Sequence, residues 1–141
     1  METATAISAR SLQYYVIGKR WASDLEFFKI ETAFLHRLLG DYFARMCDPV
    51  HVVQLNQVSK MLRKLEDDEK MTSELLKEQI VRVELIAEDF ILENSGELET
   101  THLKLEYLML NLTTAYRGLK KEMFELIETV LRQENFPPEQ N

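Results

Sequence analysis

The chain has 141 residues, of which 45% are apolar and 29% are charged, and its formal net charge is −7. This composition is typical of one soluble globular domain and excludes an intrinsically disordered chain. The acidic balance argues against a nucleic acid or an anionic membrane surface as partner, and no apolar run approaches the ~20 residues that span a bilayer. The first residues lack a basic segment followed by an apolar stretch, so we expect no signal peptide. Because Cys47 is the single cysteine, no intramolecular disulfide forms, and we expect a cytoplasmic protein. We also expect no cofactor.

A first long helix is predicted over residues 12–47. Only four Gly and three Pro occur in the chain, too few for the turns of a β-sandwich or barrel. The residues that recur at intervals of seven in this segment are mostly apolar, and this spacing places them in one stripe along a helix. Asp48-Pro49 ends this helix, because a residue before proline avoids the α region. The same pair starts the next helix, because Asp is a good N-cap and Pro suits the first helical position.

The last predicted helix covers residues 97–134. It follows Asn94-Ser95-Gly96, a combination that suits both a helix end and a new N-cap. Its inner face is rich in leucine, and the segment that begins at Asn135 and contains two prolines ends it. We expect residues 1–10 and 135–141 to be flexible.

The segment between these helices, residues 49–94, is compatible with two architectures. Its apolar residues keep a heptad spacing, as one long helix would. Residues 66–74, however, contain one apolar member and several Asp, Thr and Ser residues, which are common in turns and N-caps. A break there gives two shorter helices, 49–66 and 72–94, in an up-down-up-down four-helix bundle whose outer helices are long. Without the break, the chain forms a three-helix antiparallel bundle with one long middle helix.

Two unusually wide apolar faces favour the four-helix arrangement. In that arrangement the two faces lie at the same end of the bundle, where each helix has two neighbours. In a three-helix bundle they lie at opposite ends, and their width has no explanation. We therefore predict an all-α, single-domain four-helix bundle, with the three-helix bundle as the alternative. The two faces consist of Phe34, Leu35, Leu38, Leu39, Tyr42, Phe43 and Met46, and of Leu98, Leu103, Leu105, Tyr107, Leu108, Met109, Leu110 and Leu112.

The four-helix prediction implies an interface. Because the outer helices are longer than the inner ones, their far halves extend as a two-helix arm, and two helices cannot cover its large apolar side chains. Contiguous exposed apolar patches mark interfaces, and symmetric dimers are the commonest soluble oligomers, so we expect a homodimer through this arm. The predicted interface comprises Tyr14, Tyr15, Ile17, Trp21, Met123, Phe124, Ile127 and Leu131.

Histidine and carboxylate residues offer a second kind of site, a metal centre. Imidazole and carboxylate ligands three or four residues apart share one face of a helix, as chelation from a helix requires. Glu99 and His102 form one Glu-x-x-His motif, Glu106 lies one turn further, and His51 falls on the apolar stripe of the preceding segment. These four residues are the candidate ligands. The ferritin-like di-iron pattern needs two such motifs, so we favour partly buried histidines without a metal.

The sequence contains no motif of a nucleotide-binding loop, a hydrolase nucleophile or a zinc ribbon. In its proportions the predicted bundle resembles spectrin-like and hemerythrin-like helical proteins, a resemblance of architecture without a shared motif. We therefore predict a non-enzymatic helical module for protein–protein interaction or oligomerisation, whose partner is another protein or a second copy. A metal-binding bundle protein and a binder of small apolar ligands are the alternatives.

Overall fold

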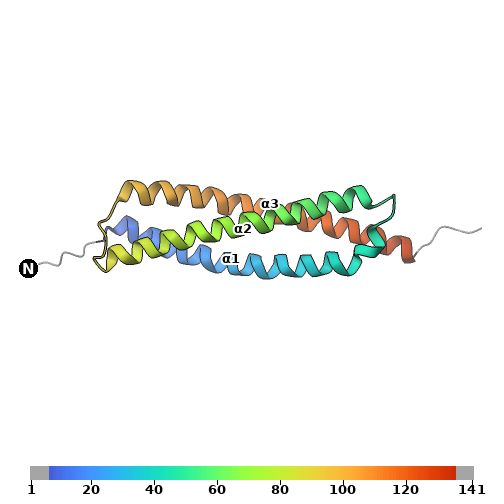
Figure 1. The fold of residues 1–141 in the computed structure, drawn as a ribbon, viewed down its shortest axis with the longest axis horizontal. Coiled ribbons are helices and arrows are strands. Elements are labelled where there is room, and N and C mark those ends of the chain that lie inside the picture. Colours follow the sequence, from blue (N-terminus) through green and yellow to red (C-terminus); the bar gives the residue numbers. More distant parts are fainter. Residues whose placement is uncertain (1–6, 136–141) are drawn as a thin grey trace, which may run out of the picture.

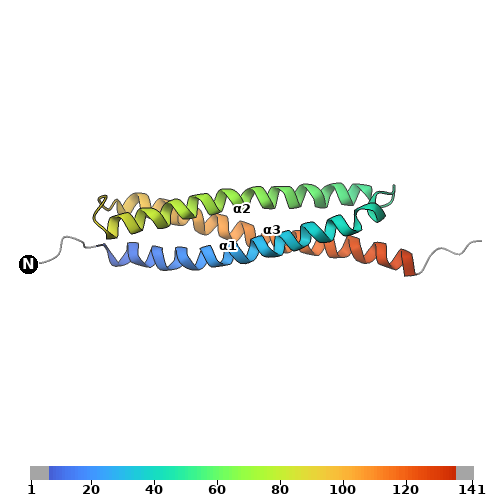
Figure 2. The same ribbon diagram turned by 60° about the horizontal axis from the view of Figure 1, so that its bottom comes forward.

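The computed structural model describes residues 7–135, which form three long α-helices and one short 3₁₀-helix (Figure 1). The elements are α1 (Ala9–Tyr42), the 3₁₀-helix η1 (Phe43–Met46), α2 (Val52–Ala87) and α3 (Ser95–Asn135). α1 and α3 run in the same direction, and α2 runs back between their ends (Figures 1 and 2). With 41 residues in α3, the bundle is a rod about 60 Å long.

The three-helix alternative fits this helix count, and the predicted break at residues 66–74 is wrong. These residues are helical within the uninterrupted 36-residue α2. Glu69 and Thr72 occupy the core positions between Leu65 and Leu76, and they are 4% and 0% exposed. The core stripe therefore continues through two polar side chains, which a pattern of apolar residues does not reveal.

The start of α1 is fixed by a network of hydroxyl groups. Ser8 precedes the helix, and its side chain accepts the backbone N–H of Ser11 at 3.1 Å, which is a standard N-cap. Glu93, from the connection between α2 and α3, accepts the hydroxyl groups of Ser8 at 2.6 Å and Ser11 at 2.7 Å. α1 thus begins at Ala9, three residues earlier than predicted. Residues 1–6 and 136–141 of the segments predicted to be flexible lie outside the described residues.

Both turn signals in the sequence correspond to caps. The Asp48 carboxylate accepts the backbone N–H of His51 at 2.8 Å, just ahead of α2. The Asn94 side chain accepts the backbone N–H of Glu97 at 3.1 Å in the first turn of α3. The break at Asp48-Pro49 falls between α1 and α2 as predicted, although α2 begins at Val52 and not at Pro49. At the second break, α3 begins at Ser95, two residues before the predicted start, whereas α2 ends at Ala87, seven residues before the predicted end at residue 94.

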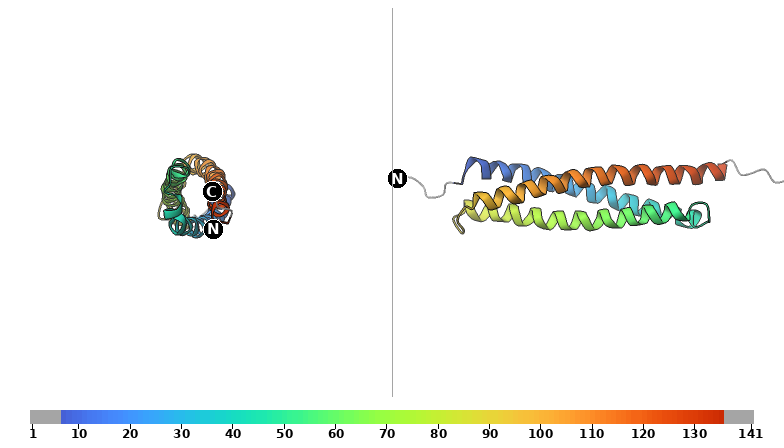
Figure 3. Two further views of the ribbon diagram at one scale, coloured as in Figure 1. Left: turned by 90° about the vertical axis from the view of Figure 1, so that its right-hand side faces the viewer. Right: turned by 90° about the horizontal axis from the view of Figure 1, so that it is seen from above.

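The core runs along the axis that the three helices surround (Figure 3). α1 and α3 contact each other less extensively than either contacts α2. The seam between α1 and α3 is therefore less tightly closed than the other two. The largest fully buried apolar side chains are Leu35, Met46, Val58, Leu65, Leu76, Leu98, Leu105, Leu119, Met123 and Leu126.

Candidate functional site

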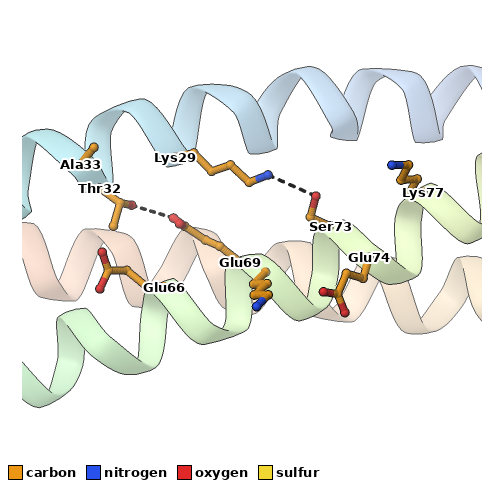
Figure 4. A pocket seen from close by; sticks show the side chains of 9 residues that line it. Lys29, Thr32, Ala33, Glu66, Glu69, Ser73, Glu74 and Lys77 are labelled. Carbon is orange, nitrogen blue, oxygen red and sulfur yellow. Dashed lines mark hydrogen bonds between the residues drawn. The ribbon is translucent and has the colours of Figure 1, made fainter.

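A polar layer interrupts the apolar core near the middle of the rod. Glu69 of α2 accepts the hydroxyl of Thr32 of α1 at 2.6 Å (Figure 4). Burial raises the pKa of the Glu69 carboxyl above its ordinary value, an effect that the Thr32 hydrogen bond partly opposes. Thr72, one turn further along α2, has a buried hydroxyl without a hydrogen-bond partner among the described residues. A carboxyl group in such a layer is costly to ionise.

Tyr116 of α3 is a second buried polar group at about this height. Its ring lies 5.6 Å from that of Phe28 of α1, and the Glu31 carboxylate lies close enough to its hydroxyl to contribute to the raised pKa of Tyr116. Burial and this carboxylate raise the pKa of the Tyr116 hydroxyl, so it stays protonated. Each helix therefore contributes at least one polar side chain to the centre of the bundle: Thr32 from α1, Glu69 and Thr72 from α2, and Tyr116 from α3.

Glu69 also forms one wall of an open pocket between α1 and α2, with a volume of about 480 Å³. Figure 4 shows Lys29 reaching across its upper side to Ser73, at a distance of 3.3 Å. Three lysines (Lys29, Lys70 and Lys77) and three glutamates (Glu66, Glu69 and Glu74) line it. Because ionisable groups of both signs line it, the pocket does not favour an ionic ligand of one sign.

The four predicted metal ligands do not come together. His51 lies ahead of α2 and His102 in the first turns of α3, at opposite ends of the rod (Figure 1). Within residues 7–135, no three His, Cys, Asp or Glu side chains are arranged so that they could hold a metal ion. Glu99, His102 and Glu106 lie within the first turns of α3, and the structure does not bring His51 to them.

Two of these residues, His51 and Glu99, interact with other charged side chains in the structure. The His51 ring is buried, with Nδ1 2.9 Å from the Asp48 carboxylate. Hydrogen bonding to His51 in turn lowers the pKa of the Asp48 carboxyl. The Glu99 carboxylate lies 3.5 Å from the Arg10 guanidinium.

His102 is held between two aromatic rings of α1. The centroids of the Tyr14 and Trp21 rings lie 4.3 and 4.8 Å from that of His102, and both rings stack on it. Burial lowers the pKa of His102, and the nearby Glu106 carboxylate partly opposes this shift. The neutral ring thus serves as a packing element of the α1–α3 seam.

The residues predicted as a dimerising arm also fail to form one surface. Because α1 and α3 are parallel, Tyr14 and Trp21 lie at the end of the rod where α3 begins, and residues 123–131 lie towards the other end (Figure 2). The long α2 covers both ends: Tyr14 and Tyr15 pack against its Val83 and Ile86. The remaining members vary in exposure. Ile17 is half-buried, Met123 and Ile127 are buried, and Phe124 and Leu131 are 42% and 37% exposed.

A different apolar surface is present, along the outer side of α1 and α3. Phe27 and Leu110 line one groove between these helices. Residues seven positions away on a helix share its side, so Phe34 extends the surface on α1. The same spacing adds residues on α3. We call this surface the α1/α3 face, and it consists of Phe27, Phe34, Leu103, Leu110 and Phe124, whose exposed fractions range from 42% to 64%.

The groove at the centre of the α1/α3 face has a volume of about 490 Å³. Its wall is aromatic and aliphatic, with the partly buried Trp21 and Phe28 opposite Met109. Asp24 of α1 and Glu106 of α3 lie at its edge, and no described residue forms an ion pair with either. The groove therefore combines an apolar floor with two free carboxylates.

Basic side chains follow further along α3. Arg117, Lys120 and Lys121 lie one to two turns beyond the groove, and within the described residues none of them forms an ion pair. The Lys120 ammonium lies 5.9 Å from the Tyr116 ring centroid and 5.8 Å from that of Phe124. The edge of the α1/α3 face on α3 thus changes from acidic to basic along its length.

The sequence indicated additional apolar side chains on the first and last helices but did not predict where they form a surface. The wide apolar faces identified from spacing contain Phe34, Leu103, Tyr107 and Leu110, all exposed. Phe27 was not among them, although it lies seven residues before Phe34. The additional apolar side chains on α1 and α3 are therefore present. They point to the outside of the bundle and do not pack against a fourth helix of the same chain.

None of the three helices has an apolar stretch of the length that crossing a membrane requires, within the residues that the structure describes. The chain matches no protein-family model, no curated protein and no solved structure.

Proposed function

We propose that this chain is a non-enzymatic helical interaction module that forms a homodimer through the α1/α3 face. The observation that carries the proposal is the set of large, exposed apolar side chains on that face, of which Phe27 and Leu110 flank one groove. Exposure of Phe27, Phe34 and Leu110 to water costs free energy that association recovers. Contiguous apolar patches of this kind on a soluble chain mark binding surfaces.

The size of the face is suited to a dimer. From Leu103 to Phe124, α3 extends for about 30 Å, and two adjacent helices are about 20 Å wide, so the face covers roughly 600 Å² per copy. A standard interface buries about 800 Å² per partner. The face alone is smaller than that, so the rest of such an interface consists of side chains of α1 and α3 beyond the span from Leu103 to Phe124.

A second copy is the partner that the architecture favours. Two α1/α3 faces stacked on each other form a four-helix layer, in which each helix has two neighbours. That environment is the one that wide apolar helix faces require. The four-helix packing predicted within one chain is thereby provided between two chains.

The proposal is tested by the mass of the protein in solution. We expect sedimentation equilibrium of the wild type to give about twice the chain mass of 16.6 kDa. The double substitution Phe27→Ser and Leu110→Ser removes two central apolar side chains and should give the monomer mass with unchanged helical circular dichroism. Both side chains are at least 60% exposed, so the fold does not depend on them.

The matched control is Val53→Ser on α2, which also replaces an exposed apolar side chain, 75% accessible, away from the face. It should leave the dimer intact. A wild type that remains monomeric at every concentration, or a control that dissociates as readily as the double variant, contradicts the proposal.

A further inference from the structure

We propose that the two copies pair antiparallel, about a two-fold axis perpendicular to the helices near Thr113, so that Glu106 of each copy meets Lys120 of the other. This inference rests on the homodimer proposed above and adds the direction of pairing and the contacts that determine it. It follows from the order of charges along α3.

The charges on α3 are arranged symmetrically about Thr113. Glu106 lies seven residues before Thr113 and Lys120 seven residues after it, so the three share one helix side. Each charge is about 10 Å from Thr113 along the axis. A two-fold axis at Thr113 reverses the helix and brings Glu106 of one copy opposite Lys120 of the other, twice per dimer.

The same axis passes close to Phe27. Phe27 and Thr113 line the same groove, and the neighbouring Phe28 contacts Tyr116, three residues after Thr113, so the two lie within about one helical turn of each other along the rod. The side chain of Phe27 is 60% exposed beside a groove of about 490 Å³. The two Phe27 side chains of the dimer thus meet near the axis, beside the grooves whose floor Trp21 and Met109 form.

The outer residues of α3 also match under this rotation. Leu103 precedes Thr113 by ten residues and Phe124 follows it by eleven, so these apolar side chains meet across the dimer. Both ends of the interface are then apolar, and the opposite charges lie between the ends and the axis. A self-complementary surface is what a two-fold interface requires.

A parallel dimer does not use these charges equally well. In a two-fold pair with parallel helices, α3 of one copy lies against α1 of the other at the same height. Phe28 of α1 contacts Tyr116 of α3. Phe34 lies six residues after Phe28, and Lys120 and Lys121 lie four and five residues after Tyr116, so the three are at about the same height along the parallel helices. A parallel pair therefore places these ammonium groups against apolar Phe34, which is a costly way to desolvate a charge.

Charge substitution tests the contact. Glu106→Lys and Lys120→Glu each place like charges opposite one another at two points of the dimer, and like charges across an interface weaken binding strongly. We expect each variant alone to dimerise at least about ten-fold more weakly than the wild type. An equimolar mixture of the two variants should restore the dimer, because both contacts are then between opposite charges.

The matched controls make the same charge changes elsewhere. Glu125→Lys on α3 and Lys60→Glu on α2 change exposed residues outside the α1/α3 face and should dimerise like the wild type. If Glu106→Lys and Lys120→Glu do so as well, or if their mixture stays monomeric, the antiparallel pairing is wrong while the dimer itself stands. A monomeric wild type would instead overturn the proposed function.

The natural cysteine gives an independent measurement of direction. Cys47 is exposed and lies twenty residues beyond Phe27, so in the antiparallel dimer the two Cys47 residues are about 60 Å apart. In a parallel dimer both lie at one end, within roughly 25 Å, about two helix diameters. Pulsed electron paramagnetic resonance between spin labels on Cys47 of the wild-type dimer separates these distances. The long distance supports the antiparallel pairing, and the short one overturns it.

Discussion

Glu69 and Glu93 are both hydrogen-bonded to hydroxyl groups, yet their surroundings shift their acidities in opposite directions. Burial dominates at Glu69 and raises its pKa, although Thr32 donates to it. At Glu93, which lies near the surface, hydrogen bonds from Ser8 and Ser11 dominate and lower the pKa. The first carboxyl therefore favours the folded state when protonated, and the second when ionised.

The Glu69 carboxyl should make the protein less stable as the pH rises. Because its folded pKa lies above the ordinary value of 4.5, the folded state binds the proton more tightly than the unfolded state. Its contribution is present below pH 4.5 and is lost as the pH rises through the folded pKa. Glu69→Gln keeps the shape without the charge, and we expect a higher free energy of unfolding at pH 7. Urea unfolding from pH 4 to 8 measures this, and a variant less stable than the wild type at pH 7 would refute it.

The hydroxyl of Thr32 supplies a companion prediction. Thr32→Val keeps the volume but leaves the buried Glu69 carboxyl without its donor. Leaving a buried polar group unsatisfied costs about 1–3 kcal/mol, so the free energy of unfolding should fall by that amount. In the Glu69→Gln background the loss should be smaller, and urea unfolding of all four combinations measures the coupling.

The cap at Ser8 should show the opposite dependence on pH. The pKa of Glu93 lies below its ordinary value of 4.5, so its contribution is present above pH 4.5 and is lost as the pH falls through the folded pKa. Ser8→Ala removes the N-cap and should cost about 1 kcal/mol. Glu93→Gln should flatten the loss of stability in acid, as measured by thermal unfolding between pH 3 and 7. If Glu93→Gln loses stability in acid as the wild type does, the hydrogen bonds from Ser8 and Ser11 to Glu93 do not contribute to stability.

At the scale of whole helices, the sequence predicted the outer elements well and the middle one poorly. The spacing of apolar residues and the caps at Asp48 and Asn94 placed α1 and α3 to within a few residues. In α2 the core positions at Glu69 and Thr72 are polar, so the apolar pattern is interrupted although the helix continues. Tertiary contacts with Thr32 and the neighbouring helices keep these side chains buried, and local sequence does not encode such contacts.

Gly118 offers a test of helix propensity within α3. A Cβ atom added there would meet only the flexible end of Met61, at 3.9 Å, which is ordinary van der Waals contact. Glycine in a helix interior is about 1 kcal/mol less favourable than alanine. Gly118→Ala should therefore raise the free energy of unfolding by up to about 1 kcal/mol. Chemical denaturation measures the change, and a destabilised variant would mean that close packing requires the glycine.

At the scale of the whole molecule, the α1/α3 face should couple stability to concentration. Dissociation accompanies unfolding of a dimer, so mass action raises the melting temperature as the protein is concentrated. We expect an increase of about 2–4 °C for each ten-fold rise in concentration. The double substitution Phe27→Ser and Leu110→Ser should abolish this dependence. Calorimetry over a hundred-fold range of concentration distinguishes the two behaviours, and a constant wild-type melting temperature would contradict the dimer.

The candidate site could be anticipated only in part. Spacing showed that α1 and α3 carry more apolar side chains than one neighbour can cover, and Phe34 and Leu110 are examples. Which of these side chains face outward depends on whether the first and last helices run parallel, and this follows from the number of helices. A single misassigned turn in α2 thus moved the predicted interface to residues such as Met123 that are buried.

The parallel course of α1 and α3 determines what the ends of the rod display. The described chain enters at one end and leaves at the other, so groups attached next to Ser8 and Asn135 are held about 60 Å apart. An antiparallel pair carries one start of α1 and one end of α3 at each tip, which makes its two tips identical. Such a dimer is a symmetric rod, and each of its ends carries the same two positions to which further groups can be attached.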